Sequence, residues 1–293
     1  MLRETIDSIL NQTFKDFELI VVDNYSTDNT EEIIKSYNDK RIRYFKNKNN
    51  GLLAVNRNFA VKKSKGWYIA ICDDDDIWLP RKLEKQIPEF EKDEQIGLVC
   101  SNGFSFNEAG KQGKMVKSIS GYFTFENLLI NNTIICPSVI FKKNILEDIG
   151  IFDESREILT GEDYELWLRI AKKYKIRYIG TPLVKYRTHA GSLNKSYLNG
   201  DKPLKVCKEI YKKLLDKKII DIELYRRVSE RSDYQHLILK LINNEPVNLE
   251  ILLKTKTSFW EKCRLISMYF LFRVGILNVL RRIRIRRNIL HIR

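Results

Sequence analysis

Four consecutive carboxylates stand in the segment ICDDDDIWLP, directly after an apolar run and directly before a Trp and a Pro. Asp73, Asp74, Asp75 and Asp76 repel one another when they are ionised, and a divalent cation removes that cost. Mg²⁺ and Mn²⁺ prefer oxygen ligands, and Mg²⁺ is usually held by one or two carboxylates together with substrate phosphates. The run predicts a metal that joins the protein to a diphosphate. The alternative is that one Asp caps the helix beginning near Pro80 and the others point into water.

Two predicted strands end at this run and at an earlier acid. The segments FELIVVD (17–23) and WYIAICD (67–73) are short apolar runs, and each ends at an Asp. Such runs indicate buried strands, and ligands of open α/β sheets bind beyond the carboxyl ends of the strands. Asp23 and the Asp73–Asp76 run therefore define one candidate cleft.

Helical patterns alternate with strand patterns along the chain. We expect helices near 1–10, 26–37, 51–63, 81–92 and 161–174, and strands at 17–23, 41–45, 67–73 and 96–102. This alternation predicts an α/β fold with a mainly parallel sheet that helices cover on both faces. The segment THAGSLNKSYLNGDKP has the composition of a linker. We expect a first domain at 1–195 and a helical, basic C-terminal region at 203–293.

The overall composition bounds the class of protein. The chain has 293 residues, of which 43% are hydrophobic, so it can bury a sizeable core and we do not expect disorder. Lys and Arg number 52 against 38 Asp and Glu, and the formal charge of +14 favours anionic partners. Most of this excess lies after residue 250, where eleven basic residues accompany one acid, Glu261.

Cysteine usage and the N-terminal segment indicate the compartment. The five cysteines are far apart and include no CxxC pair, so we expect neither a disulfide framework nor a zinc site. The first segment, MLRETIDSIL, carries charges and lacks the apolar centre of a secretory signal. Both features predict a protein of the reducing cytosol.

Three segments in a fixed order resemble the family 2 glycosyltransferases. They are FELIVVDNYSTDNT, NNGLLAVNRNFAVKKSKGWYIAICDDDDIWLPRKLEKQ and GEDYELWLRIA, and the resemblance covers roughly residues 1–195. It implies the GT-A fold and a transfer that inverts configuration at the sugar. The donor is then a nucleoside diphosphate sugar, and the acceptor is a hydroxyl of a glycan or lipid-linked glycan in bacterial surface polysaccharide assembly.

The resemblance also implies roles on the donor side. The acidic run stands where the family has its DxD-like motif for Mg²⁺ or Mn²⁺, with Asp75 and Asp73 as metal ligands. Asp73 or Asp74 would reach the ribose or a metal-bound water. Asp23 and Asn24 stand where the family reads the base of the nucleotide. Since an amide both donates and accepts hydrogen bonds, Asn24 leaves the identity of that base open.

Two cationic side chains and one acidic pair complete the implied site. Arg57, in NRNFA, matches a helix beside the nucleotide, and His189 matches a His that faces the diphosphate; a solvated helix face and a structural His are the alternatives. Asp163, in GEDYELW, matches the catalytic base, which takes the proton of the acceptor hydroxyl. Glu162 would shape the acceptor site. By themselves, Glu162 and Asp163 are typical of acids that complement a helix dipole.

The sequence departs from the family at its start. Members begin with an apolar strand, whereas this chain begins at the helix that would follow it. We therefore expect a gap or an unpaired edge in the sheet. An upstream start, a substitute segment and an impaired product are the alternatives. Asn56 also replaces the usual Ala beside Arg57.

The C-terminal segment combines apolar and basic residues. LISMYFLFRVGILNVL is shorter than the ~20 apolar residues of a membrane-spanning helix, and RRIRIRRNILHIR follows it. We predict peripheral contact with an anionic membrane, at the inner face of the plasma membrane. The alternative is a helix that packs on the first domain with a solvated basic end. No recognition module accompanies the charge, so we do not expect nucleic acid as a partner.

The function predicted from these observations is a metal-dependent, inverting glycosyltransferase. A catalytically impaired remnant that binds a nucleotide sugar or a membrane is the main alternative. A basic protein that only binds membranes or nucleic acid is a third class.

Overall fold

The computed structural model describes residues 1–107, 110, 112–115, 120–189, 202–242, 247, 250, 261 and 264–269. The chain forms two compact units, Met1–Asn199 and Gly200–Arg293. Residues 190–201 of the predicted linker at 188–203, and most of the basic tail, lie outside the described residues. The assignment of a catalytic domain and a membrane-associating region to these parts of the chain stays a prediction.

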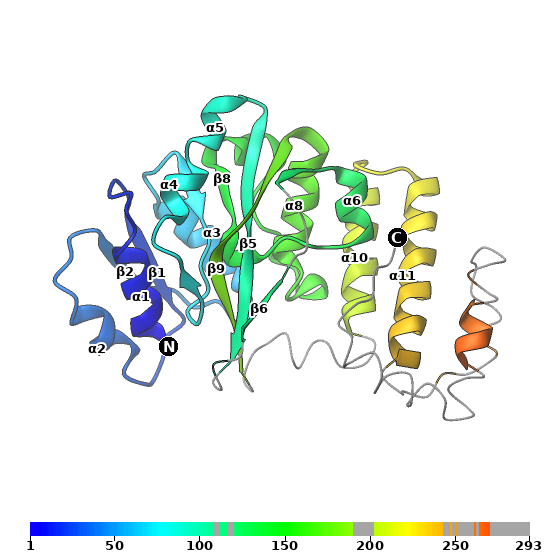
Figure 1. The fold of residues 1–293 in the computed structure, drawn as a ribbon, viewed down its shortest axis with the longest axis horizontal. Helices are drawn as coiled ribbons and strands as arrows, with labels where there is room; N and C mark the ends of the chain where they lie inside the picture. Colours follow the sequence, from blue (N-terminus) through cyan, green and yellow to red (C-terminus); the bar gives the residue numbers. More distant parts are fainter. Residues whose placement is uncertain are drawn as a thin grey trace. The chain divides into compact units, whose positions relative to one another are not determined.

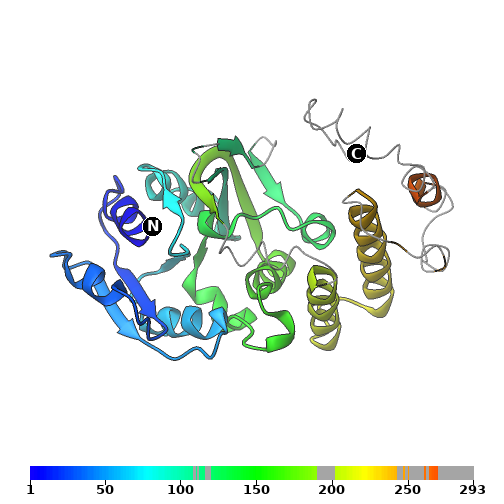
Figure 2. The same ribbon diagram turned by 90° about the horizontal axis from the view of Figure 1, so that it is seen from below.

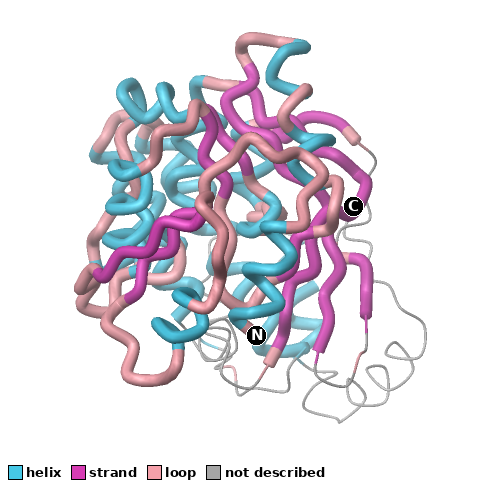
Figure 3. The backbone as a smooth tube through the Cα atoms, turned by 90° about the vertical axis from the view of Figure 1, so that its left-hand side faces the viewer, coloured by secondary structure: helices cyan, strands magenta, loops and turns pink. Residues whose placement is uncertain are grey.

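The first half of unit 1 alternates helices and strands as expected. Its elements are α1 (Leu2–Leu10), β1 (Leu19–Asp23), α2 (Thr30–Lys35), β2 (Ile42–Lys46) and α3 (Leu53–Lys63). β1 and β2 pair in parallel and form a sheet of their own, with Asp23 opposite Lys46 at the carboxyl ends. Figure 3 shows β1 and β2 as a pair of strands apart from the strands of the second, larger sheet. This separation agrees with the expected gap in the sheet.

The second sheet has seven strands around a long central pair. Its strands are β3 (Tyr68–Ala70), β4 (Ile77–Trp78), β5 (Ile96–Asn107), β6 (Gln112–Lys114), β7 (Gly121–Phe123), β8 (Ile140–Lys142) and β9 (Lys175–Thr188). The order is β3-β8-β5-β9-β4, while β6 pairs with β5 and β7 pairs with β9. β5 and β9 are parallel, and every other pair in this sheet is antiparallel.

Helices cover both faces of the strands. The remaining helices of unit 1 are α4 (Lys82–Gln86), α5 (Glu89–Lys92), α6 (Phe125–Ile130), α7 (Leu146–Ile149) and α8 (Glu162–Lys173), with short 3₁₀ turns η1 (Cys136–Ser138), η2 (Lys143–Ile145) and η3 (Arg156–Ile158). Figures 1 and 2 show α3 and α8 on one side of the strands and α1 and α4 on the other. Pro88 lacks the N–H that would continue α4, so the predicted helix at 81–92 is divided in two.

The predicted α/β architecture with flanking helices is confirmed, and its sheet is mixed rather than mainly parallel. The difference arises from strands that the sequence did not reveal. β8 and β4 are only three and two residues long, and β9 contains Gly180, Pro182 and several charged residues that obscure its pattern. These strands supply most of the antiparallel pairs.

One hydrophobic cluster joins the helices α1 and α4 to the sheet. Ile9 of α1, Leu83 of α4, Val99 of β5, Ile140 of β8 and Val184 of β9 are all buried in it. A second group of side chains seats α8: Trp167 is fully buried, with ring centroids 5.9 Å from Phe141 and 6.2 Å from Phe152. The interpretation of Trp167 as a core residue is therefore confirmed.

The described part of unit 2 is helical. It contains α10 (Lys202–Asp216), α11 (Ile222–Ile242) and a helical segment at 264–269. Leu237, Ile238, Leu241, Leu265 and Tyr269 form its buried cluster. The predicted C-terminal helices are confirmed for these residues. Within the ranges that the structure describes, no helix is long and apolar enough to cross a membrane.

Candidate active site

The four adjacent aspartates have different surroundings. They form the turn between β3 and β4, in which the Asp76 N–H donates to the Asp73 carbonyl at 3.3 Å. Asp76 is fully buried, and its Oδ1 accepts the backbone N–H of Arg187 at 2.8 Å. Burial raises the pKa of Asp76 to about 8. Asp76 thus anchors the turn to β9 and does not face a ligand.

Asp75 and Asp74 lie on the outer side of this turn. Asp75 Oδ2 is 3.0 Å from Nε2 of His189, and its carbonyl accepts the Arg187 Nε–H at 2.7 Å. Asp74 is exposed, and its carbonyl accepts the Thr5 hydroxyl at 2.9 Å. The end of β9 therefore fixes Asp75 from two sides and brings His189 to the acidic run.

Arg57 joins the acidic run to the start of α8. Its Nη2 donates to Asp73 Oδ1 at 3.0 Å and its Nη1 to Glu162 Oε1 at 2.8 Å, and the guanidinium carbon lies 5.8 Å from the centroid of the Phe152 ring. The Arg57 side chain is only 13% exposed. Burial lowers its pKa, but the acidic groups around it, first Cys136 and then the carboxylates, outweigh burial and raise it. Arg57 therefore remains a cation, and the alternative of a solvated helix face is wrong.

Glu162 and Asp163 occupy the first turn of α8. Burial raises the pKa of both carboxyl groups, and the charge of Arg57 opposes that rise. The Cys136 side chain in η1 forms a hydrogen bond with Asp163 and lowers the pKa of that carboxyl. Burial raises the pKa of the Cys136 thiol itself well above its usual value, so the thiol stays protonated and acts as the donor. Cys136 is a site residue that no sequence pattern indicated.

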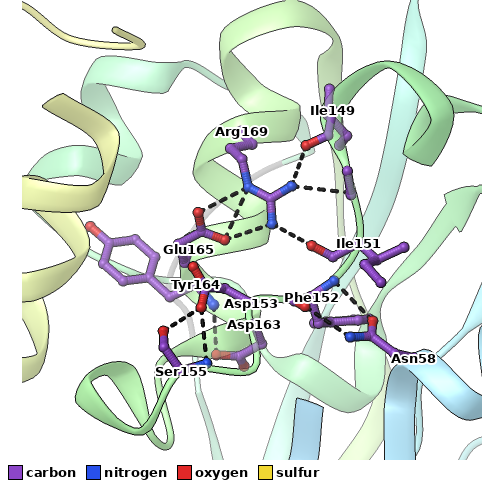
Figure 4. Close-up of polar contacts among 11 residues, drawn as sticks. Asn58, Ile149, Ile151, Phe152, Asp153, Ser155, Asp163, Tyr164, Glu165 and Arg169 are labelled. Atoms are coloured by element: carbon purple, nitrogen blue, oxygen red, sulfur yellow. Dashed lines mark hydrogen bonds and ion pairs between the residues drawn. The ribbon is translucent and has the colours of Figure 1, made fainter. Parts of the chain in front are cut away.

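A buried ion pair holds α8 in place (Figure 4). Arg169 Nη2 donates to Glu165 Oε2 at 2.6 Å and to the Ile151 carbonyl at 2.7 Å, and Nη1 donates to the carbonyls of Ile149 and Gly150. The two side chains are 5% and 0% exposed. This pair ties the helix to the preceding turn.

The same loop is tied to α3. Asn58 Nδ2 donates to the Phe152 carbonyl at 2.8 Å, and the Phe152 N–H donates back to Asn58 Oδ1 at 3.0 Å. Arg57 precedes Asn58 on α3, so this reciprocal pair of hydrogen bonds fixes the position of Arg57 along α3 relative to the start of α8. The loop ends at Thr160, a non-glycine residue with a φ of 69°. Strain of this kind persists where surrounding structure imposes it, often at functional sites.

Asp23 and Asn24 lie at the end of the smaller sheet. Asp23 Oδ1 accepts the Ser26 N–H at 2.9 Å, and its Oδ2 accepts the Tyr44 hydroxyl at 2.7 Å. Burial raises the pKa of Asp23, but these hydrogen bonds outweigh burial and lower it. Asn24 Oδ1 accepts the Asn49 N–H at 2.9 Å. Among the described residues, no hydrogen bond or ion pair joins this pair to the acidic run.

The structure thus arranges the predicted residues other than Asp74 in three groups. Arg57, Asp73, Glu162 and Asp163 form the central group; Asp75 with His189 and Asp23 with Asn24 form the other two. Within the described ranges, no three His, Cys, Asp or Glu side chains are arranged to hold a metal by themselves.

Asp76→Asn is expected to remove one source of pH-dependent stability. Because the folded pKa of Asp76 is about 8, the folded state holds this proton more tightly than the unfolded state. Its stabilising effect is complete below the unfolded pKa, about 3.9, and is lost as the pH rises towards the folded pKa. The unfolding free energy can be measured by urea titration, with EDTA present, at about pH 5 and at about pH 9. Between these two pH values, the unfolding free energy of the variant should fall by about 2–4 kcal/mol less than that of the wild type. Equal losses would contradict a buried, protonated Asp76.

The fold is that of the GT-A glycosyltransferases. The crystal structure of S. aureus TarS 1-349 in complex with UDP-GlcNAc matches with a TM-score of 0.64 at 20% identity, over 92% of this chain and 76% of that chain. The predicted GT-A fold is therefore confirmed.

The family model of glycosyl transferase family 2 matches residues 1–150, and the chain belongs to this family. An uncharacterized glycosyltransferase of Methanocaldococcus jannaschii is 41% identical over 197 residues, which are 64% of this chain and 65% of that protein. The chain thus spans just under two thirds of this relative. WfaP of Escherichia coli is 36% identical over 192 residues, 65% of this chain and 73% of the enzyme. WfaP is named a UDP-Glc:alpha-D-GlcNAc-diphosphoundecaprenol beta-1,3-glucosyltransferase.

Proposed function

We propose that the protein is a metal-dependent, inverting glycosyltransferase. It moves a sugar from a nucleoside diphosphate sugar to a hydroxyl of a glycan or lipid-linked acceptor in bacterial surface polysaccharide assembly. Family membership and the donor and acceptor named for WfaP support this proposal. The observation that carries it is the pair of Arg57 contacts, which join the acidic run to Glu162 beside Asp163. Donor-side and acceptor-side carboxylates thereby belong to one site.

Asp163 acts as the general base in this proposal. An inverting transfer needs one carboxylate near the acceptor hydroxyl, which takes the proton as the oxygen attacks the sugar from the side opposite the diphosphate. The raised pKa of Asp163 makes it a stronger proton acceptor than an ordinary carboxylate. Glu162 forms an ion pair with Arg57. Glu162 therefore positions the Arg57 guanidinium and shapes the acceptor side, and it does not take the proton.

Asp73 and Asp75 are the residues that would hold Mg²⁺ or Mn²⁺. One oxygen of each is engaged, by Arg57 and by His189, and each carboxylate has a second oxygen. This donor set fits a cation bound by one or two carboxylates that takes its other ligands from phosphate and water. When bound, the cation would neutralise charge on the leaving diphosphate. Arg57 and His189 keep the two carboxylates apart and oriented.

Metal removal should abolish activity. Purified protein is tested with UDP-, GDP- and dTDP-sugars, with Mn²⁺ or Mg²⁺ and after EDTA. We expect one nucleotide to be released from its sugar donor. EDTA should stop this release, added metal should restore it, and its rate should fall about 10²-fold or more in Asp75→Ala. The control is Asp148→Asn, whose carboxylate forms an exposed ion pair with Lys173 away from these groups. Nucleotide binding without turnover for every donor would instead support the impaired remnant.

Cys136→Ala should move the pH dependence of the reaction. The base works only when it is deprotonated, and removing the thiol donor raises the pKa of Asp163 further. The acidic limb of kcat/KM should therefore shift to higher pH, by about half a unit. Cys136→Ser keeps a donor and should not show this upward shift. An unchanged limb in Cys136→Ala would exclude this role of the thiol.

The inner face of the plasma membrane is the proposed location. The basic, apolar C-terminal composition and the lipid-linked acceptor named for WfaP support it. Sedimentation of the full chain with anionic but not neutral vesicles tests it. Equal recovery in the supernatant with both would contradict it.

A further inference from the structure

Tyr25 has a backbone conformation that its side chain disfavours. Its φ is 58°, in the left-handed region that glycine occupies freely and that is a genuine outlier for a bulky residue. A non-glycine residue keeps such a conformation only where the surrounding structure imposes it, and such residues cluster at ligand sites. The strain therefore needs a reason.

Packing does not supply that reason. Tyr25 is 58% exposed, so its ring is not a core side chain. A large aromatic side chain that is strained and also faces solvent gains little from the fold itself. What the conformation does achieve is to present the ring at the surface.

The ring lies at the carboxyl end of the smaller sheet. Tyr25 directly follows Asp23 and Asn24, and Asp23 pairs with Lys46 across β1 and β2. Neighbouring polar groups are fixed: Ser26 and Tyr44 hold Asp23, and Asn24 is tied to the Asn49 N–H. An exposed aromatic face thus stands beside a rigid row of hydrogen-bonding groups at the edge where sheets of this class bind ligands.

We propose that Tyr25 is the stacking platform for the nucleobase of the donor, which rests on the proposed function. A planar base can lie on the ring while its edge meets Asn24 and Asp23. Stacking tolerates any base because every base has a π-face. Tyr25 therefore sets the affinity for nucleoside diphosphates in general, and the polar neighbours set which base is preferred.

A substitution at Tyr25 can distinguish the role of the ring from the role of the backbone conformation. Asn tolerates the left-handed region, so Tyr25→Asn removes the ring and keeps the turn. Calorimetry with UDP, GDP and dTDP as probes should show binding weakened about 5- to 100-fold in Tyr25→Asn. Tyr25→Phe keeps an aromatic ring and should bind these nucleotides with the wild-type affinity. Thermal unfolding of Tyr25→Asn should occur at the wild-type temperature or above, since strain is relieved. Tyr122→Ala, at another exposed tyrosine, should bind as the wild type does.

Inorganic pyrophosphate, which has no base, completes the test. Its binding should be the same in the wild type and in Tyr25→Asn. Unchanged binding of all three nucleotides in Tyr25→Asn would overturn the proposal while leaving the transferase function intact. Equal weakening of pyrophosphate and nucleotide binding would also overturn it, because the turn and not the ring would then matter. A wild type that binds none of the three nucleotides would overturn the proposed function as well.

Discussion

Asp163→Asn is expected to lower sugar transfer by about 10²–10⁴-fold, the range that general base catalysis contributes. Asn is close to Asp in size and can still accept a hydrogen bond, but it cannot take a proton from the acceptor hydroxyl. Asp163 lies beside Arg57 in the central group and shares it with Glu162. The loss should therefore appear in kcat, measured as product formed from donor and acceptor.

Donor affinity is the control for this variant. In the proposed mechanism Asp163 serves the acceptor, so calorimetric binding of the nucleotide should change less than about threefold, under about 1 kcal/mol. Asp148→Asn should transfer at the wild-type rate, because its carboxylate pairs with Lys173 and Tyr174 at the far end of α8. Full transfer activity in Asp163→Asn would require another base and would remove the proposed mechanism.

Arg169→Met is expected to lower the unfolding free energy by about 3–5 kcal/mol, the usual cost of removing one partner of a buried ion pair. The Glu165 carboxylate is fully buried and would be left without its cation. The carbonyls of Ile149, Gly150 and Ile151 would lose their donors as well. Urea denaturation measures this loss, and it should exceed that of an exposed pair.

A second variant separates the charge from the packing. In Glu165→Leu with Arg169→Met, both charges are replaced by apolar groups, and about half or more of the lost free energy should return. Lys173 of α8 forms an exposed ion pair with Asp148 of α7, and Lys173→Met should cost less than about 1 kcal/mol of unfolding free energy. Equal losses in Arg169→Met and Lys173→Met would show that the buried pair does not hold α8.

Local patterns were enough for the elements that carry the predicted residues. The apolar runs ending at Asp23 and before Asp73, and the amphipathic pattern from Glu162, became β1, β3 and α8. Local pattern failed for β9, the partner of β5 in the centre of the sheet, because Gly180 and Pro182 interrupt its alternation. A strand buried by its neighbours needs little pattern of its own.

Contiguous residues were enough to indicate the family resemblance, the α/β alternation and the acidic run. Folding was needed to show which of the four aspartates is buried, and that Arg57 bridges Asp73 and Glu162, residues 16 and 105 positions away from it. It also brought the Cys136 thiol to Asp163. Burial and long-range contact depend on how distant elements pack, and packing sets the pKa values and charges on which the proposed chemistry depends.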